Sequence, residues 1–231
     1  MIGKKVNRLR KKTKLDFPLY CITCAEFSAG RSNIEVARQI IAGGGKLLQY
    51  REKKKSKKEK YFEARLLREM CSRAGAAFIV NDDVDIALAV KADGVHLGQG
   101  DMPLKAARRL VGAKMIIGVS THAPQQAREA ISQGADYLGI GPLFPTRTKE
   151  DVCPPVGLGY LDYAVRQVAI PFVAIGGIKL RNLEQVLAHG ASCVAMVTEV
   201  VGAADICFRV RQILTKISQK KLDSVTTTLH C

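Results

Sequence analysis

The sequence predicts an α/β fold, a single closed barrel of eight parallel strand-and-helix units, the (β/α)8 or TIM barrel. Short apolar runs alternate with helix-like segments almost to the end of the 231-residue chain, without a break in composition. The runs number eight and are continuously apolar, as expected for strands that are covered on both faces. A doubly wound sheet is the alternative, but the glycine fingerprint that usually follows its first strand is absent after Cys21.

The expected strands are short, often β-branched runs that end at glycine, proline or polar residues. They span 18–23, 47–51, 77–81, 94–97, 114–119, 137–140, 172–175 and 193–197. Each precedes a segment with helical spacing of apolar residues, at 32–42, 56–74, 84–90, 103–111, 124–133, 158–168, 180–189 and 200–218. We therefore expect one catalytic barrel domain at 17–220, a basic N-terminal tail at 1–16 and a C-terminal tail at 221–231.

Hydropathy and cysteine usage indicate a soluble chain in a reducing compartment. No apolar run approaches the roughly 20 residues that a membrane helix needs, and the basic N-terminus is not followed by an apolar signal core, so we expect a cytoplasmic protein without a membrane partner. Seven cysteines, an odd number scattered through apolar segments, favour free thiols. Cys21 and Cys24 form a single CxxC, which favours core packing over a metal site because structural zinc needs four ligands.

The formal net charge of +15 raises the question of nucleic-acid binding. Much of the charge lies in 4–14 and 53–60, and the chain has no Trp and few other aromatic residues near these runs on which bases would stack. We therefore expect small anionic substrates and no nucleic acid. A basic polyanion-binding module is the non-enzymatic alternative; it predicts a strongly salt-dependent affinity that is lost when 1–16 are deleted.

Polar residues follow the second strand at intervals of two, so Gln49, Arg51 and Lys53 point the same way from an extended chain. An amide, a guanidinium fork and an ammonium suit a diphosphate beside a polar ring. A surface ion-pairing edge is the alternative for such a triplet. In a barrel, this end of the strands is the face on which catalysis takes place.

Acidic residues follow the third and fourth strands. Because neighbouring strands lie about 5 Å apart, Asp82 and Asp101 are expected to reach one hard cation, and we predict a Mg²⁺ site there. Helix N-capping is the alternative, above all for Asp83, which directly precedes a helix. His96 lies within a strand and is expected to be a packed residue, or one that supports a site residue from behind, and not a ligand.

Further donors follow the remaining strands. Ser120 can donate to phosphate, and His122 is either an acid–base group or a loop hydrogen-bonding residue. The loop after the sixth strand offers Thr146, Thr148 and Lys149, two hydroxyls and an ammonium that suit an anion. The seventh and eighth strands end at Gly176-Gly177 and Val197-Thr198, the recurrent phosphate-binding position of this fold, which implies a second phosphate.

These segments together resemble a known family. QYREK, NDDVDIALAVKADGVHLGQGD, GVSTH, GADYLGIGPLFPTRTK and IPFVAIGGI occur in the order seen in thiamine-phosphate synthases, also called thiamine-phosphate pyrophosphorylases, over roughly 17–216. The resemblance implies a Mg²⁺-assisted transferase of thiamine biosynthesis that joins 4-amino-2-methyl-5-(diphosphooxymethyl)pyrimidine to 4-methyl-5-(2-phosphoethyl)thiazole, or its carboxylated form. The products are thiamine phosphate and pyrophosphate, formed by a dissociative substitution.

The resemblance also implies roles for individual residues. Gln49 contacts the pyrimidine, Asp82 and Asp101 bind Mg²⁺, and the diphosphate is held by Arg51, Lys53, Asn81, Ser120 and Lys149, of which Arg51, Lys53, Ser120 and Lys149 are the expected catalytic residues. The thiazole phosphate is held by Thr146, Thr148, Gly177, Val197 and Thr198. The chain departs from many relatives after the eighth strand, where Thr198 provides a hydroxyl in place of a serine-containing stretch. A related thiazole tautomerase, with His122 as the proton-transfer group, is the alternative activity.

Overall fold

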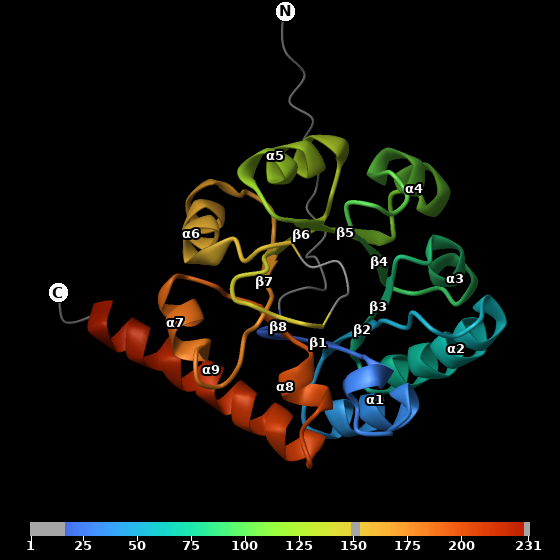
Figure 1. Ribbon diagram of the computed structural model, residues 1–231, viewed down its shortest axis with the longest axis horizontal. Coiled ribbons are helices and arrows are strands. Elements are labelled where there is room, and N and C mark those ends of the chain that lie inside the picture. Colours follow the sequence, from blue (N-terminus) through green and yellow to red (C-terminus); the bar gives the residue numbers. More distant parts are fainter. Residues whose placement is uncertain (1–16, 149–152, 229–231) are drawn as a thin grey trace, which may run out of the picture.

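The computed structural model describes residues 17–148 and 153–228, except the side chains of 221 and 223–228. Within these residues, parallel strands β1 to β8 form a closed barrel in sequence order, with β8 paired to β1 (Figure 1). The strands are β1 Leu19–Ile22, β2 Leu47–Tyr50, β3 Ala77–Asn81, β4 Gly94–Leu97, β5 Ile116–Thr121, β6 Tyr137–Ile140, β7 Phe172–Ala174 and β8 Val194–Met196. The predicted (β/α)8 barrel is confirmed, and each strand lies where the apolar runs predicted it to within about two residues.

Helices surround the barrel (Figure 1). They are α1 Asn33–Ala42, α2 Lys57–Arg73, α3 Val84–Ala89, α4 Leu104–Val111, α5 Pro124–Gln133, α6 Gly157–Gln167, α7 Leu183–Ala188, α8 Thr198–Val201 and α9 Ile206–Thr228, with a short 3-10 turn at Ala25–Phe27. Serine N-caps begin the first two helices: Ser32 accepts from the Glu35 amide, and Ser56 forms a reciprocal capping box with Glu59. Such caps satisfy amide donors that have no partner within the helix.

The last helical segment differs from the prediction of one helix at 200–218. It is divided into α8 and α9, because the chain leaves the helical path at Gly202 and the Asp205 carboxylate accepts a hydrogen bond of 2.8 Å from the Phe208 amide, which caps a new helix. Helix α9 then continues to Thr228. Most of the segment 221–231 that we expected to be a tail is therefore helical, while 1–16 lie outside the described residues.

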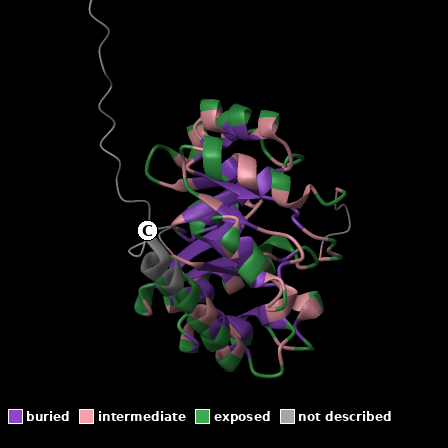
Figure 2. Cartoon of the chain, turned by 90° about the vertical axis from the view of Figure 1, so that its left-hand side faces the viewer, coloured by how far each residue is buried: buried purple, intermediate pink, exposed green. Residues whose placement is uncertain are grey.

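Two apolar layers support the barrel. The larger layer lies between the strands and the helices, and the smaller fills the barrel interior. Buried residues concentrate on the strands, and exposed residues lie on the surrounding helices and loops (Figure 2). The interior layer contains Tyr20, Ile22, Leu47, Ala77, Ile79, Tyr137, Val173, Cys193 and Ala195. Gly118 on β5 makes room for the Tyr137 ring, because a Cβ at Gly118 would overlap with it. The Tyr137 ring is therefore closely confined by β5 within the barrel interior.

The cysteines of the CxxC pair behave as predicted. Cys21 and Cys24 are both buried and free, and they pack in the layer between strands and helices. Across the described part of the chain, no helix is long and apolar enough to cross a membrane.

Candidate active site at the carboxyl end of the barrel

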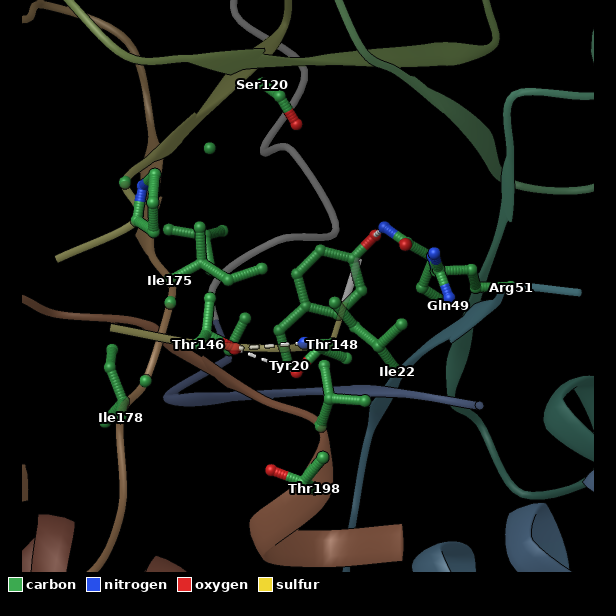
Figure 3. Close-up of a pocket in the computed structure, with 18 of the residues that line it drawn as sticks. Tyr20, Ile22, Gln49, Arg51, Ser120, Thr146, Thr148, Ile175, Ile178 and Thr198 are labelled. Carbon is green, nitrogen blue, oxygen red and sulfur yellow. Dashed lines mark hydrogen bonds between the residues drawn. The ribbon is translucent and has the colours of Figure 1, made fainter. Parts of the chain in front are cut away.

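A cavity of about 690 Å³ opens at the carboxyl end of the strands (Figure 3). Most of the predicted site residues line it, namely Gln49, Arg51, Asn81, Ser120, His122, Thr146, Thr148, Gly177, Val197 and Thr198. Lys53, Asp82 and Asp101 do not line the cavity itself, and Lys149 lies outside the described residues. The structure thus brings together side chains that are more than 140 positions apart in the sequence.

Arg51 follows β2, and its backbone is tied to the neighbouring strand. The Arg51 amide donates to Thr23 Oγ1 at 3.0 Å, and one guanidinium nitrogen contacts Cys24 Sγ at 3.5 Å. The guanidinium Nε is buried and has no hydrogen-bond partner among the described residues. Because a buried charged donor without a partner is costly, this guanidinium is suited to an anionic ligand in the cavity.

The loop after β2 is anchored by Glu52. Its carboxylate accepts from the Lys54 amide at 2.9 Å and from Asn33 Nδ2 at 3.0 Å. Hydrogen bonds to the ionised carboxylate and the nearby Lys55 ammonium outweigh burial and lower the pKa of Glu52. These hydrogen bonds anchor the backbone between Arg51 and Lys53, the two cations that follow β2.

Three charged groups meet beside the cavity. Lys53 forms an ion pair with Asp82, and the Asp82 carboxyl is within hydrogen-bonding contact of Asp101. Burial and the neighbouring Asp101 carboxylate raise the pKa of Asp82, and the Lys53 ammonium opposes this rise. The Asp101 carboxylate also accepts from the Gly98 amide at 2.6 Å, which orients it. Two carboxylates in contact form a donor set that a hard cation would stabilise.

Asp83 occupies the N-cap position of α3, the alternative that the sequence offered for it. Its side chain, however, makes no capping hydrogen bond. Its carboxylate instead pairs with Lys57 at 2.5 Å and with Lys60 at 3.0 Å. Part of the 53–60 basic run is therefore neutralised on the helix surface.

A chain of polar side chains crosses the barrel interior beneath the cavity. Gln49, Tyr20, Tyr137, His96 and Ser120 are linked by successive hydrogen bonds of 2.8–2.9 Å. All five line the cavity, and they come from β2, β1, β6, β4 and β5 respectively. His96 is 8% exposed and packs against the Tyr137 ring, which confirms that it is a packed residue.

His122 lines the cavity with its ring held by the backbone. Its Nδ1 contacts the Gly141 carbonyl oxygen at 2.5 Å. Because a carbonyl only accepts, Nδ1 carries a proton and donates it to the Gly141 oxygen. This loop hydrogen bond was one of the two roles that the sequence allowed for His122.

The loop after β6 contacts the loop after β7. Gly177, at φ 64°, lies so close to the first loop that a Cβ would come within 2.6 Å of the Pro145 carbonyl oxygen and 2.7 Å of Phe144 Cβ. In the first loop, the Thr146 and Thr148 hydroxyls contact each other at 2.9 Å (Figure 3). Gly177 therefore permits both the close contact between the two loops and the left-handed backbone conformation, which a larger residue would not. The two loops together form one wall of the cavity.

Two cations that the sequence reasoning missed lie at the β7–β8 end. Lys179 Nζ donates to Thr198 Oγ1 at 2.6 Å and lies 3.6 Å from the Glu199 carboxylate, which also pairs with Arg209. Lys179 and the exposed Arg181 both line the cavity. Their position directly after the Gly176-Gly177 pair was an available signal, because glycines and cations together are typical of phosphate sites.

Comparisons with known proteins show the family to which the chain belongs. The family model for thiamine monophosphate synthase matches residues 19–200. A thiamine-phosphate synthase from Pelotomaculum thermopropionicum is 56% identical over 207 residues, which cover 90% of this chain and 95% of the relative. Another from Lawsonia intracellularis is 50% identical over 201 residues, covering 87% and 93%. The solved structure of thiamine phosphate pyrophosphorylase from Pyrococcus furiosus has a TM-score of 0.82 and 36% identity, covering 90% of this chain and 98% of that one. The chain belongs to the thiamine monophosphate synthase family.

Proposed function

We propose that the protein joins the pyrimidine diphosphate and the thiazole phosphate to give thiamine phosphate and pyrophosphate. The observation that carries this proposal is a single cavity with two polar walls. Gln49, Arg51, Asn81 and Ser120 line one part of it, and Thr146, Thr148, Gly177 and Thr198 line another. Two walls of hydrogen-bond donors suit two phosphorylated substrates whose reacting atoms meet between them.

The pyrimidine diphosphate lies on the β2–β5 side. Gln49 contacts the pyrimidine ring, and the Arg51 guanidinium, with its unpartnered Nε, binds the diphosphate together with Asn81 and Ser120. Lys53 and Lys149 complete the set of cations around the leaving group. Donors aimed at the departing diphosphate stabilise the charge that develops there, which is the main source of rate acceleration expected for this chemistry.

Asp82 and Asp101 fit a Mg²⁺ ion. Their carboxyl groups are in contact, and the raised pKa of Asp82, caused by burial and by Asp101, reflects an electrostatic cost that a divalent cation would remove. No cluster of three or more possible metal ligands occurs in the described ranges, so Asp82 and Asp101 would hold the ion together with oxygens of the substrate diphosphate. When bound, the ion neutralises charge on the departing pyrophosphate.

The thiazole phosphate lies on the β6–β8 side. Thr146 and Thr148 offer hydroxyls from one loop, while Gly177, Val197 and Thr198 offer backbone amides and a hydroxyl from the other two. Lys179, already in contact with the Thr198 hydroxyl, adds a cation at this end. Hydroxyl, amide and ammonium donors together satisfy the oxygens of a phosphate dianion.

The reaction requires ionisation and positioning more than acid–base catalysis. The bond from the pyrimidine methylene to the diphosphate oxygen breaks with its electron pair leaving on oxygen, and the thiazole nitrogen lone pair forms the new carbon–nitrogen bond. No proton is transferred in that step, so the cavity needs no general base. The protein's residues hold the leaving group and orient the thiazole nitrogen toward the methylene carbon.

The direct test mixes the protein with both substrates, with and without Mg²⁺, and measures pyrophosphate and thiamine phosphate. The proposal expects both products only when both substrates and the metal are present, and it expects Lys149→Ala to lower turnover. Isomerisation of the thiazole carboxylate without new bond formation, abolished by His122→Asn, would instead establish the tautomerase alternative.

A further inference from the structure

The donor at one end of the hydrogen-bond chain through the barrel interior, the Gln49 amide nitrogen, determines the direction of the whole chain. The chain connects Gln49 Nε2 to the Tyr20 hydroxyl (2.9 Å), that hydroxyl to Tyr137 (2.9 Å), Tyr137 to His96 Nδ1 (2.8 Å), and His96 Nε2 to Ser120 Oγ (2.9 Å). We call these five residues the interior chain. Both of its ends, Gln49 and Ser120, belong to the proposed pyrimidine diphosphate side, whereas its middle members were not predicted as site residues.

At the first end, the amide nitrogen of Gln49 can only donate, so the Tyr20 oxygen accepts there. Burial raises the pKa of both Tyr20 and Tyr137, so each phenol retains its one proton. Within the described residues, the Tyr20 hydroxyl has no further hydrogen-bond partner than Gln49 and Tyr137. Its proton therefore points to the Tyr137 oxygen, because any other direction leaves a buried O–H unpaired at a cost of about 1–3 kcal/mol.

The donor and acceptor roles of the two tyrosines then determine which nitrogen of the His96 imidazole carries the proton. Because the Tyr137 oxygen accepts from Tyr20, its own proton is donated to His96 Nδ1, which must be the unprotonated nitrogen. The neutral His96 ring consequently carries its proton on Nε2 and donates it to Ser120 Oγ. The Ser120 oxygen is thus an acceptor within the chain, and its own proton is the one that remains for a group in the cavity.

We propose that Tyr20, Tyr137 and His96 are positioning residues that fix Ser120 as a hydrogen-bond donor and Gln49 as a hydrogen-bond acceptor toward the pyrimidine diphosphate. The inference rests on the proposed function for the identity of that substrate. With its nitrogen engaged by Tyr20, Gln49 presents its Oε1 as the acceptor for an amino group on the ring. The Ser120 proton is directed at an anionic oxygen. If the hydrogen bonds of the interior chain ran in the opposite direction, Ser120 would donate its proton to His96 and could not donate it to the substrate.

The His96 tautomer tests this direction without any measurement of activity. In protein labelled with ¹⁵N-histidine, long-range ¹H–¹⁵N correlation spectra distinguish Nδ1–H from Nε2–H rings, and His96→Gln identifies the His96 signals by their loss. We expect His96 to be protonated on Nε2 only. A His96 ring protonated on Nδ1, alone or together with Nε2, would overturn the proposal.

A double-mutant cycle tests whether the chain acts through Ser120. Tyr137→Phe removes the proton that His96 Nδ1 accepts, and we expect it to lower kcat/KM for the pyrimidine diphosphate about tenfold, as Ser120→Ala does. Because both changes interrupt the same path, the double variant should be at most about twofold below Ser120→Ala alone. If the loss of kcat/KM in the double variant equalled the product of the two single losses, Tyr137 would not act through Ser120.

Tyr160→Phe is the matched control. Tyr160 is also a buried tyrosine, 6% exposed, and its hydroxyl donates to Thr121 Oγ1 at 2.7 Å, but it belongs to neither the interior chain nor the cavity. We expect its kcat/KM to stay within about twofold of the unmodified enzyme, as for a lost hydrogen bond remote from substrate. An unmodified enzyme that fails to make thiamine phosphate would refute the proposed function, whereas the tautomer result would still decide the direction of the chain.

Discussion

The Lys53 ammonium and the Asp82 carboxylate form an ion pair beside the cavity, so a proposed diphosphate ligand and a proposed metal ligand neutralise each other. The Lys53 side chain is 53% exposed and that of Asp82 is 19% exposed, so the pair lies where water and ions can reach it. The proposed binding of Mg²⁺ and diphosphate would offer each member a new partner of opposite charge. The ion pair therefore competes with both ligands and links their binding.

Lys53→Gln should consequently affect the two ligands in opposite directions. Without the ammonium, Asp82 and Asp101 form a more negative site, and we expect Mg²⁺ alone to bind about two- to fivefold more tightly, the range for an exposed ion pair. The KM for the pyrimidine diphosphate should rise, since a cation that binds it is lost. Isothermal titration with Mg²⁺ in the absence of substrate measures the first effect, and weaker metal binding would contradict the competition.

Asp101→Asn should lower turnover and increase the Mg²⁺ requirement. The amide keeps the shape of the side chain but removes a negative charge next to Asp82, so we expect kcat at ordinary Mg²⁺ to fall at least tenfold, with partial recovery at high Mg²⁺. The rate of pyrophosphate release, measured as a function of Mg²⁺ concentration, tests both the loss of kcat and its recovery. Asp85→Asn is the control, because Asp85 pairs with Lys57 on the exposed surface of α3. A variant of Asp101 with unchanged metal dependence would argue against the site.

Arg51→Lys should weaken pyrimidine diphosphate binding although it conserves charge. An ammonium cannot reproduce the guanidinium fork or its buried Nε donor, so we expect KM for this substrate to rise about tenfold while KM for the thiazole phosphate changes little. Steady-state kinetics with each substrate varied in turn measures both values. Arg65→Lys, on the exposed face of α2, is the matched control. Equal increases in both KM values would indicate a general disturbance of the cavity.

The barrel was predictable because its strands are covered on both faces, which leaves short continuous apolar runs that periodicity detects. The same property hid the interior chain. Tyr20 and Tyr137 lie in apolar runs and look like ordinary core residues, because inward and outward positions follow from the register between strands and not from one strand. Gln49 and Ser120 were predicted as site residues because they are polar and lie near strand ends, where this fold holds its site, and both line the cavity.

The last helix shows a local signal that was overlooked. Gly202 and Asp205 interrupt an otherwise helical pattern, and glycine followed by an N-capping residue is the usual mark of one helix ending and another beginning. Lys179 illustrates a different limit. The predicted barrel already made β7 and β8 neighbours, but which side chain of the loop after β7 reaches Thr198 depends on the path of that loop, which the sequence does not provide.

Lys179→Gln should reduce binding of the thiazole substrate through its phosphate. We expect KM for the thiazole phosphate to rise about five- to tenfold with kcat within about twofold, the effect of losing a charge-assisted hydrogen bond in ground-state binding. The KM for the unphosphorylated thiazole alcohol should not change, because the alcohol lacks the phosphate that Lys179 is proposed to bind. Lys105→Gln is the matched control, because Lys105 is exposed on α4 and the variant loses one positive charge at a position outside the cavity. Equal increases in KM for the thiazole phosphate and the thiazole alcohol would show that Lys179 does not bind the phosphate.

Gly118→Ala should destabilise the barrel at the position where the interior chain crosses it. The new methyl group would overlap with the Tyr137 ring, and overpacking of a closed interior typically costs about 1–3 kcal/mol. For a domain of this size we expect Tm to fall by roughly 2–4 °C for each kcal/mol, as followed by thermal unfolding. Displacement of Tyr137 should also lower activity, because it breaks the hydrogen bond to His96.

The opposite sign is expected for the same substitution at Gly159. This residue is exposed in α6, and a Cβ there meets no atom within 4 Å, so Gly159→Ala gains helix propensity without a clash. We expect it to stabilise the protein by about 0.5–1 kcal/mol and to leave activity unchanged. If Gly118→Ala were as stable as the unmodified protein, Tyr137 would not be confined by β5. A fixed position for this phenol, and with it the direction of the interior chain, depends on that confinement.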